Sequence, residues 1–295
     1  MNMSDLPGLR HDEPMSRHVS WRAGGHARHF YQPADVADLC SHLRTLARDE
    51  AVLFVGLGSN LLVRDGGFNG TVVFTHHALT GIDVHGSTIA AGAGVPAPHL
   101  ARYVAKHGGA GAEWMAGVPG TIGGALAMNA GCYGGETWNH VVSVQTVDRA
   151  GNLRERMPSD YEIAYRHVRL RSNADEWFVS GRFQFQQGDE GASMARIRDL
   201  LKKRVASQPL GEPNAGSVFR NPPGDHAARL IESCALKGFT IGGAQVSRKH
   251  SNFIVNLGDA TARDIEAVID HVEATVRERT GISLVREVRI VGEAA

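Results

Sequence analysis

The most constraining feature of this 295-residue chain is a glycine-rich segment that begins at Gly117 and ends at Glu136. Its sequence, GVPGTIGGALAMNAGCYGGE, contains seven glycines, far more than a single turn requires. Because glycine has no Cβ, such a main chain can lie directly against a ligand. Thr121, followed by small residues, is expected to begin a short helix whose N-terminus faces an anion. The segment therefore predicts a backbone site for a pyrophosphate, with a tightly packed small-residue helix as the alternative.

A second glycine turn, GLGSNLLV, runs from Gly56 to Val63 after an apolar stretch. Its two glycines and the pair Ser59–Asn60 can expose backbone N–H groups that wrap a phosphate. The turn is not a dinucleotide-binding GxGxxG fingerprint, because Leu61 stands where that pattern needs its last glycine. An ordinary connection between a strand and a helix is the alternative interpretation.

Charge and cysteine usage narrow the class of partner. Thirty-one basic residues balance thirty-one acidic ones, so the chain lacks the field that attracts nucleic acid or an anionic membrane. No apolar run is long enough for a membrane helix, and the polar N-terminus does not resemble a signal peptide. The cysteines, Cys40, Cys132 and Cys234, are widely spaced and form no CxxC, and no HExxH occurs. We expect a cytoplasmic protein with a small-molecule ligand, no metal, and no nucleic-acid or membrane partner.

The length and the 42% apolar content predict two or three subdomains. Hydrophobic periodicity predicts helices at 34–48, 98–107, 194–205, 227–236 and 261–280, and strands at 51–56, 61–64, 71–74, 82–84, 88–91, 177–185, 252–256 and 284–291. The stretch SQPLGEPNAGS has the composition of a linker and places a boundary near residue 206. We therefore expect a polar N-terminal segment at 1–19, subdomains at 20–80 and 81–205, and an α+β unit at 206–295.

Three isolated polar residues have the chemistry of a reaction site. They are Arg166 in YEIAYRHV, Ser217 in PNAGSVFRNP and Glu287 in LVREVRIVG. Taken singly, Arg166 is better explained as a surface arginine, Ser217 as a turn serine and Glu287 as half of a pair with Arg289. Together, an arginine can hold a carboxylate, a hydroxyl can move a proton, and a carboxyl group can orient a substrate. Spacing alone does not bring them together.

Seven segments in this order resemble the UDP-N-acetylenolpyruvoylglucosamine reductase family, from Ser20 to Gly292. They are SWRAGG, GLGSNLL, GVPGTIGGALAMNAGCYGGE, YRHV, QPLGEPNAGSVFRNP, LKGFTIGGAQVSRKHSNFIVN and LVREVRIVG. The resemblance implies an α+β protein with a vanillyl-alcohol-oxidase-like, PCMH-type FAD-binding fold. Its two α/β subdomains would be 20–80 and 81–205, and the substrate-binding domain would be 206–295, whose last strand can return to the FAD site.

The resemblance also implies an activity. This is the NADPH-dependent, FAD-mediated reduction of UDP-N-acetylglucosamine enolpyruvate to UDP-N-acetylmuramate in peptidoglycan synthesis, and so in cell wall biogenesis, cell shape and cell division. NADPH would deliver hydride to a non-covalently bound FAD, which would pass it to the terminal carbon of the enolpyruvyl group. We expect a monomer.

Site residues follow from the matching motifs. Ser217 resembles the acid that protonates the adjacent carbon, and Arg166 and Glu287 resemble the groups that bind and polarise the carboxyl end. Asn221, Lys249 and His250 are weaker candidates for substrate contacts, and the last two are equally well explained as solvated loop residues. The implied FAD-binding set is Gly56, Leu57, Gly58, Ser59, Asn60, Leu61, Gly117, Val118, Pro119, Gly120, Thr121, Gly123, Gly124, Asn129 and Gly131.

The chain departs from the family pattern in three places. Val19–Ser20 replaces the usual Asn-Thr pair, and Val168 replaces a serine whose hydrogen bond would support Arg166. A tyrosine-bearing insertion is missing, which is typical of the shorter, second type in the family. The alternatives are a sugar or lactone oxidase with the same FAD architecture, which would not need the serine of NAGSVFRNP, and a nucleotide-binding module without catalysis.

Overall fold

The computed structural model describes residues 7–295, so residues 1–6 of the predicted segment 1–19 lie outside it. Its mixture of helices and strands confirms the predicted α+β class. The chain divides into two compact units. The first contains the residues up to Leu9, Phe30–Gly56 and Val72–Arg204, and the second contains Arg10–His29, Leu57–Thr71 and Val205–Ala295. The predicted division at residues 20, 81 and 206 stays a prediction.

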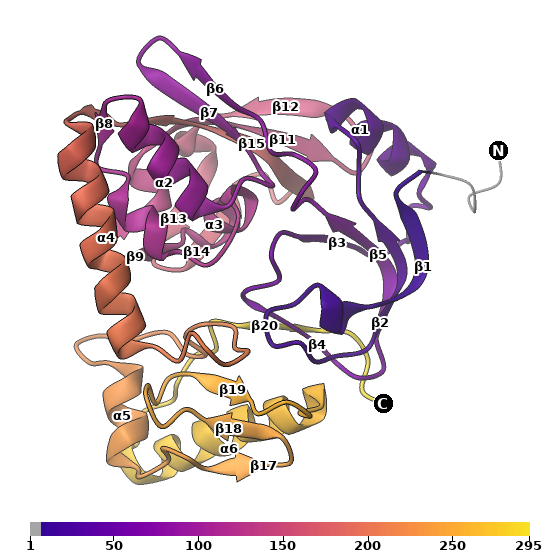
Figure 1. Cartoon of the computed structure of the whole chain (residues 1–295). Helices are drawn as coiled ribbons and strands as arrows, with labels where there is room; N and C mark the ends of the chain where they lie inside the picture. Colours follow the sequence, from indigo (N-terminus) through magenta and orange to yellow (C-terminus); the bar gives the residue numbers. More distant parts are fainter. Residues whose placement is uncertain (1–6) are drawn as a thin grey trace. The chain divides into compact units, whose positions relative to one another are not determined.

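The first unit is built on a five-stranded antiparallel sheet (Figure 1). Its order is β12-β11-β15-β7-β6, with β6 at Ile82–His85, β7 at Thr88–Gly92, β11 at Val141–Asp148, β12 at Leu153–Arg156 and β15 at Glu176–Gln184. The predicted strands at 82–84 and 88–91 are confirmed and form a hairpin, because His85 pairs with Thr88 and leaves Gly86 and Ser87 as its turn. Helix α3 (Ile122–Met128) packs against β15 and β7, and α2 (Ala97–Lys106) contributes to the same apolar core.

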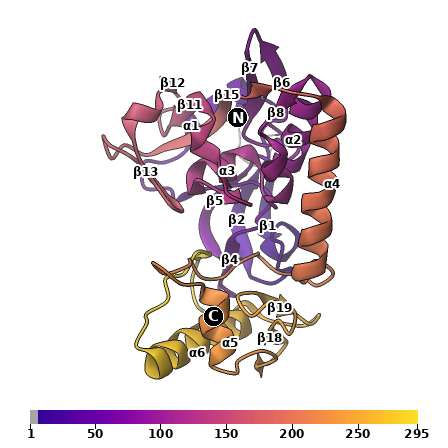
Figure 2. The same cartoon turned by 90° about the vertical axis from the view of Figure 1, so that its left-hand side faces the viewer.

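Smaller elements complete this unit. They are α1 (Val36–Thr45), β3 (Val52–Val55), β8 (Gly109–Ala110), η3 (Glu113–Gly117), β9 (Gly131–Cys132), β10 (Gly135–Glu136), η4 (Thr137–Asn139), η5 (Pro158–Asp160), β13 (Tyr161–Ala164), β14 (His167–Leu170) and β16 (Gln186–Gln187). The long helix α4 (Glu190–Ser207) is prominent in Figure 2. It begins four residues before the predicted start, because the Asp189 side chain accepts a hydrogen bond from the amide of Ala192, as an N-cap does.

The second unit packs helix α6 (Ala262–Thr280) on a short antiparallel sheet (Figure 1). The sheet has the order β17-β18-β19, at Thr240–Ile241, Ala244–Val246 and Ile254–Asn256, and α5 (Ala227–Ser233) lies against α6. The predicted helix at 261–280 is confirmed. Thr261 and Asp264 form its capping box, and the helix ends at Gly281, whose φ is +74°. Its buried apolar face is Ile265, Val268, Ile269, Val272 and Val276.

The predicted closing strand at 284–291 is wrong in length. Strand β20 covers Arg289–Val291 alone and pairs in parallel with β4 (Leu61–Val63). The residues before it leave the regular ladder, since the amides of Glu287 and Val288 both donate to the carbonyl of Val218.

A four-stranded sheet has the order β1-β2-β5-β3, with β1 at Leu9–Pro14, β2 at His26–Tyr31 and β5 at Phe68–Phe74.

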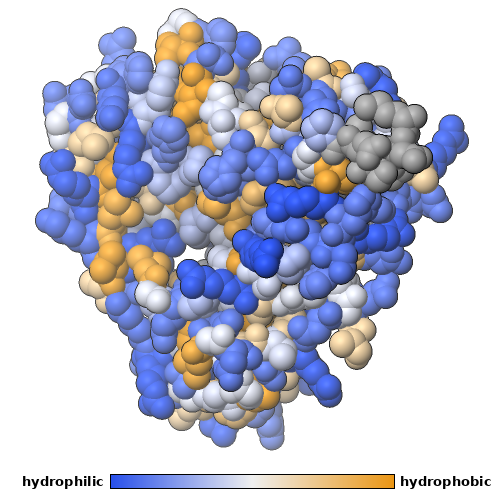
Figure 3. Space-filling view, turned by 45° about the vertical axis from the view of Figure 1, so that its right-hand side comes forward, coloured by the Kyte–Doolittle hydropathy of each residue, from blue (hydrophilic) through white to orange (hydrophobic). Residues whose placement is uncertain are grey.

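The face in Figure 3 is largely hydrophilic, with apolar residues in small groups. Exposed large apolar side chains such as Val84, Leu153 and Leu257 come from separate elements. Every helix of the described chain is too short or too polar to cross a bilayer.

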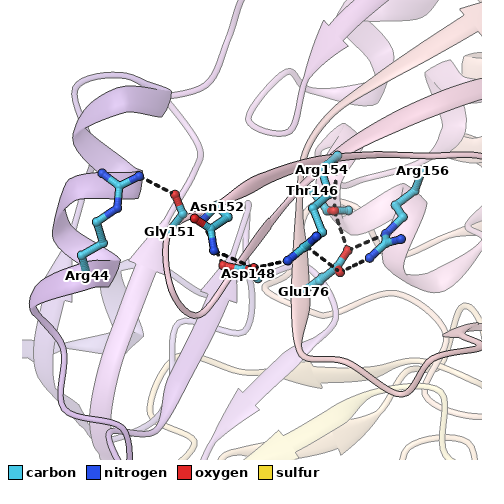
Figure 4. A network of polar contacts seen from close by, with 8 residues as sticks. All are labelled: Arg44, Thr146, Asp148, Gly151, Asn152, Arg154, Arg156 and Glu176. Carbon is cyan, nitrogen blue, oxygen red and sulfur yellow. Dashed lines mark hydrogen bonds and ion pairs between the residues drawn. The ribbon is translucent and has the colours of Figure 1, made fainter.

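A buried carboxylate ties the edge of the five-stranded sheet together (Figure 4). Glu176 of β15 accepts hydrogen bonds from the Nε atom of Arg156 at 3.0 Å and from the hydroxyl of Thr146 at 2.6 Å. Its side chain is only 3% exposed. The hydrogen bonds from Arg156 hold the pKa of Glu176 below its ordinary value, against the effect of burial.

The network extends along the sheet edge to α1. Asp148 accepts from the amide of Asn152 at 2.9 Å and from Arg154 at 3.1 Å, while Arg44 of α1 donates to the carbonyl of Gly151 at 2.9 Å. These bonds fix the turn between β11 and β12 against α1 (Figure 4).

We predict that Glu176→Gln lowers the free energy of unfolding at neutral pH by about 1–3 kcal/mol, because buried partners lose their acceptor. A depressed folded-state pKa contributes stability above the unfolded value of 4.5 and loses it as the pH falls. The difference in the free energy of unfolding between wild type and variant should therefore become smaller at acidic pH, as measured by urea unfolding. Glu155→Gln, at an exposed position in β12, is the matched control. A gap that does not change with pH would contradict this role.

Candidate functional site

The glycine-rich segment forms the short helix α3 and the strands that follow it. Thr121 is the N-cap of α3, as predicted, and Asn129 ends the helix in the left-handed conformation, with φ of +42°. The first helical amides are already bound by the protein. Ile122 donates to the carbonyl of Val95 at 2.8 Å and Gly123 to that of Ala93 at 2.9 Å. The helix N-terminus is thus less available to an anion than the sequence suggested.

Most glycines of this segment are required by packing within the unit. A Cβ on Gly117 would lie 2.7 Å from the Sγ atom of Cys132, one on Gly123 would lie 2.9 Å from the Cβ of Ala93, and one on Gly131 would lie 2.2 Å from the carbonyl oxygen of the facing strand. Real Cβ atoms do not approach so closely, so these positions exclude a side chain.

Gly124 is different. It is exposed, and its φ is not in the left-handed range. Apart from the adjacent residues and the backbone of α3 itself, the nearest described atom to a Cβ there would be the Oγ1 atom of Thr121 at 3.9 Å. Nothing in the described part of this unit therefore requires glycine at position 124. A molecule that lies against α3 would require it.

Thr121 adds a second sign of a binding site. Its side chain is buried, and its hydroxyl has no hydrogen-bond partner among the described residues. Leaving a buried hydroxyl unsatisfied costs about 1–3 kcal/mol, which a ligand or a water can offset. A Cβ on Gly56 would lie 2.2 Å from this same hydroxyl, so the start of the glycine turn packs directly on the start of α3.

The glycine turn connects two strands, β3 and β4, rather than a strand and a helix. The chain passes from the first unit to the second between Gly56 and Leu57. In the second unit, Gly58 has φ of +57° and its carbonyl accepts from the amide of Ser20 at 3.2 Å. Asn60 donates from Nδ2 to the carbonyl of Glu287 at 3.0 Å. The end of the turn is therefore fixed beside Glu287.

Ser217 and Glu287 are brought together in the second unit. The amide of Glu287 donates at 2.8 Å to the carbonyl of Val218, the residue after Ser217. Gly216 precedes the serine with φ of +75°, and its amide donates to the side chain of Asn214 at 3.0 Å. Both candidate side chains are half-buried.

Arg166 lies in the first unit, in the turn between β13 and β14. It adopts φ of +54°, a conformation that costs energy for a residue other than glycine. Its guanidinium donates to the carbonyls of Asn129 at 3.2 Å and Gly131 at 2.8 Å, and it lies 5.0 Å from the ring centre of Tyr165. The candidate arginine is thus held at the end of α3.

The weaker candidates have contacts of their own. Asn221 accepts from the amide of Ala227 at the start of α5, at 3.1 Å, and Lys249 donates from Nζ to the carbonyl of Val205 at 2.6 Å. His250 has a buried Nδ1 atom without a partner in the described chain, and burial lowers the pKa of its ring. Substrate contact by these three residues stays a prediction.

Several members of the predicted cofactor set have buried side chains, such as Leu61 and Val118, which are each only 6% exposed. Cofactor binding by this set stays a prediction. The sequence did not predict two contacts of the candidate residues: Tyr165 lies next to Arg166, and Glu136 accepts a hydrogen bond from Asn129 at 3.0 Å. The signal for Glu136 appears only once the end of α3 and the strand β10 are known. No cluster of three or more potential metal ligands occurs in residues 7–295.

Comparisons with known proteins show the family of the chain. A model described as an FAD binding domain matches residues 27–155, and one described as the C-terminal domain of UDP-N-acetylenolpyruvoylglucosamine reductase matches residues 208–291. Two proteins named UDP-N-acetylenolpyruvoylglucosamine reductase are similar over nearly the whole chain. The one from Thiobacillus denitrificans is 57% identical over 96% of this chain and 92% of that protein, and the one from Alkalilimnicola ehrlichii is 56% identical over 98% and 96%.

A solved structure also matches. The crystal structure of UDP-N-acetylenolpyruvylglucosamine reductase from Thermus caldophilus superposes with a TM-score of 0.82 at 28% identity, covering 96% of this chain and 99% of that one. With the FAD binding domain match, this confirms the predicted PCMH-type fold.

The glycines of α3 yield a paired prediction. Gly123→Ala should lower the free energy of unfolding by about 1–3 kcal/mol, because its Cβ overpacks against Ala93. Gly124→Ala should raise it by about 0.4–1 kcal/mol, because the unfolded chain loses freedom at a site with room for a methyl group. Denaturant unfolding of the ligand-free protein measures both. Equal destabilisation by the two changes would show that position 124 is also packed.

Proposed function

Because the chain belongs to the UDP-N-acetylenolpyruvoylglucosamine reductase family and is a flavin-dependent oxidoreductase, we propose that it reduces UDP-N-acetylglucosamine enolpyruvate to UDP-N-acetylmuramate. FAD is the proposed mediator and NADPH the proposed electron donor, in the synthesis of peptidoglycan precursors. The observation that carries the proposal is an identity of 56–57% to two such reductases across at least 96% of the chain. A cytoplasmic location and a monomeric state stay predictions.

The proposed FAD site uses the two glycine segments. The unpartnered hydroxyl of Thr121 and the exposed glycine at position 124 support this assignment. FAD held by these segments would supply the hydride chemistry between NADPH and the enolpyruvyl group. The protein's own part is to hold the dinucleotide against backbone, with Gly124 allowing close approach. The side chain of Asn129 is engaged within the protein, so its proposed share in this site is through main chain.

Arg166 and Glu287 are the proposed partners of the substrate's carboxyl end. An arginine fork donates two parallel hydrogen bonds to a carboxylate, which fixes both its position and its plane. This end of the substrate is a carboxylate from the start and gains further negative charge as the enolate develops, so a fixed cation there strengthens substrate binding and also stabilises the transition state. The firm anchoring of the guanidinium at the end of α3 supports this role.

Ser217 is the proposed proton donor to the carbon next to the reduced one. A serine hydroxyl is a weak acid, so the transfer depends on a strongly basic enolate and on accurate aim. Two features support an accurate orientation of the Ser217 hydroxyl: the turn at Gly216 and the backbone hydrogen bond from Glu287 to Val218. They fix the main chain on both sides of the serine.

The proposed function is tested with the purified holoenzyme. A yellow protein should oxidise NADPH in the presence of the UDP-linked enolpyruvyl sugar and much more slowly without it, and NADH in place of NADPH measures the strictness of the donor. Oxygen consumption with a simple sugar and no response to the UDP-sugar would favour an oxidase instead. A protein that remains colourless after incubation with FAD would refute the flavin assignment.

We predict that Ser217→Ala keeps the reduction of flavin by NADPH but slows the reoxidation of flavin by substrate about 100- to 10,000-fold, the usual range for proton donation. Stopped-flow absorbance follows the two half-reactions separately. Ser283→Ala, at an exposed position of the same unit, is the matched control. Equal loss in both half-reactions would assign Ser217 a structural role.

Gly124→Val should reduce FAD retention, because a branched Cβ intrudes on the surface that the dinucleotide needs. The ratio of flavin to protein absorbance measures retention, and circular dichroism checks the fold. Ala127→Val, at another exposed position of α3, tests the cost of a branched side chain on this helix. Undiminished flavin in a folded Gly124→Val protein would count against this placement.

A further inference from the structure

A buried asparagine joins the glycine-rich segment to the candidate arginine. Asn129 is 2% exposed and ends α3 in the left-handed conformation. Asparagine tolerates this conformation better than most residues, but glycine tolerates it best. The backbone at this position therefore does not by itself require an asparagine.

The side-chain amide of Asn129 makes three hydrogen bonds within the first unit. Nδ2 donates to the carbonyl of Ala164 at 3.2 Å and to Oε2 of Glu136 at 3.0 Å, while Oδ1 accepts from the amide of Trp138 at 3.1 Å. Because a carbonyl only accepts and a main-chain N–H only donates, this set fixes the orientation of the amide. The amide is therefore held by the fold in one position.

These contacts surround the turn that carries Arg166. Ala164 pairs with His167, so Tyr165 and Arg166 form the turn between β13 and β14. The Asn129 side chain holds the carbonyl that precedes this turn, and the Asn129 carbonyl accepts from Nη1 of Arg166 at 3.2 Å. One residue thus binds both the main chain before the turn and the guanidinium that emerges from it.

The conformation of Arg166 needs such support. A non-glycine residue with φ of +54° is strained and persists only where its surroundings fix it. A long arginine side chain also has many rotamers, and each must be excluded before the fork can meet a carboxylate in one geometry. The carbonyls of Asn129 and Gly131 provide that restraint.

We infer that Asn129 is a positioning residue for Arg166: through the turn and the guanidinium it sets the geometry in which the arginine meets the substrate's carboxyl group. This inference rests on the proposed function. It also separates the roles of main chain and side chain at this residue, since the main chain of Asn129 has a proposed share in the FAD site and its side-chain amide acts on the substrate side.

The test is Asn129→Gly in the holoenzyme, since glycine keeps the left-handed backbone and removes the amide. The probes are the UDP-linked enolpyruvyl sugar and UDP-N-acetylglucosamine, which lacks the carboxyl group. The KM for the first should rise by up to about 100-fold, the scale of a misplacement near 1 Å. The dissociation constant of the second, measured by flavin absorbance, should not change.

A double-mutant cycle distinguishes a positioning role of Asn129 from a general loss of structure. If Asn129 acts through Arg166, then Asn129→Gly combined with Arg166→Ala should be no worse than Arg166→Ala alone. Asn173→Gly is the matched control, because Asn173 is an exposed asparagine with φ of +55° in the same unit. If Asn129→Gly fails to fold, Asn129→Ser removes the amide donor to Ala164 without adding a charge beside Glu136, and it should show the same rise in KM.

Three outcomes would overturn the inference: a KM like that of wild type, equal weakening of both probes, or loss of FAD from the variant. The assay of the wild-type protein distinguishes failure of this inference from failure of the proposed function. If wild type shows no substrate-dependent oxidation of NADPH, the proposed function fails. If wild type is active and the variant has an unchanged KM, only the role of Asn129 fails.

Discussion

The close approach of α3 to the loop that contains Ala93 is the constraint on which the first unit depends. The amides of Ile122 and Gly123 donate to the loop carbonyls, and the distance leaves no room for a Cβ at position 123. This contact fixes α3 over β15 and β7, and so fixes both ends of the helix. At one end the hydroxyl of Thr121 is left without a partner, and at the other Asn129 holds Arg166. A packing requirement thus places two chemically different groups.

The sequence predicted those parts of the fold whose determinants are local. Helix α6 has its capping box, its apolar face and its terminal glycine within one stretch of chain, and its predicted ends are confirmed. The hairpin of β6 and β7 is also set by adjacent residues. Strand β20 was predicted too long because its alternating pattern continues through residues 284–288, where the amides bind the remote Val218 instead of a ladder partner.

The candidate site could also be predicted from the sequence only in part. Residue type and motif suggested Arg166, Ser217 and Glu287, but their surroundings depend on contacts between segments far apart in sequence. The left-handed backbone of Arg166 has no sequence signal, and the bond from Asn129 to Ala164 spans a separation of 35 residues. The glycine pattern also did not tell Gly124, which has space around it, from Gly123, which has none. Only the coordinates of the surrounding atoms separate a glycine needed for packing from one needed by a ligand.

The parallel pairing of β4 with β20 has a consequence for the order in which the protein is made. Asn60 contacts Glu287 across 227 residues of sequence, and the pairing of Leu61 with Arg289 spans a similar distance. During translation, β4 leaves the ribosome long before its partner exists, so its apolar edge stays unpaired until residues 289–291 have been synthesised. Closing so long a loop is slow, and the second unit should become protected from chaperones and proteases later than the first.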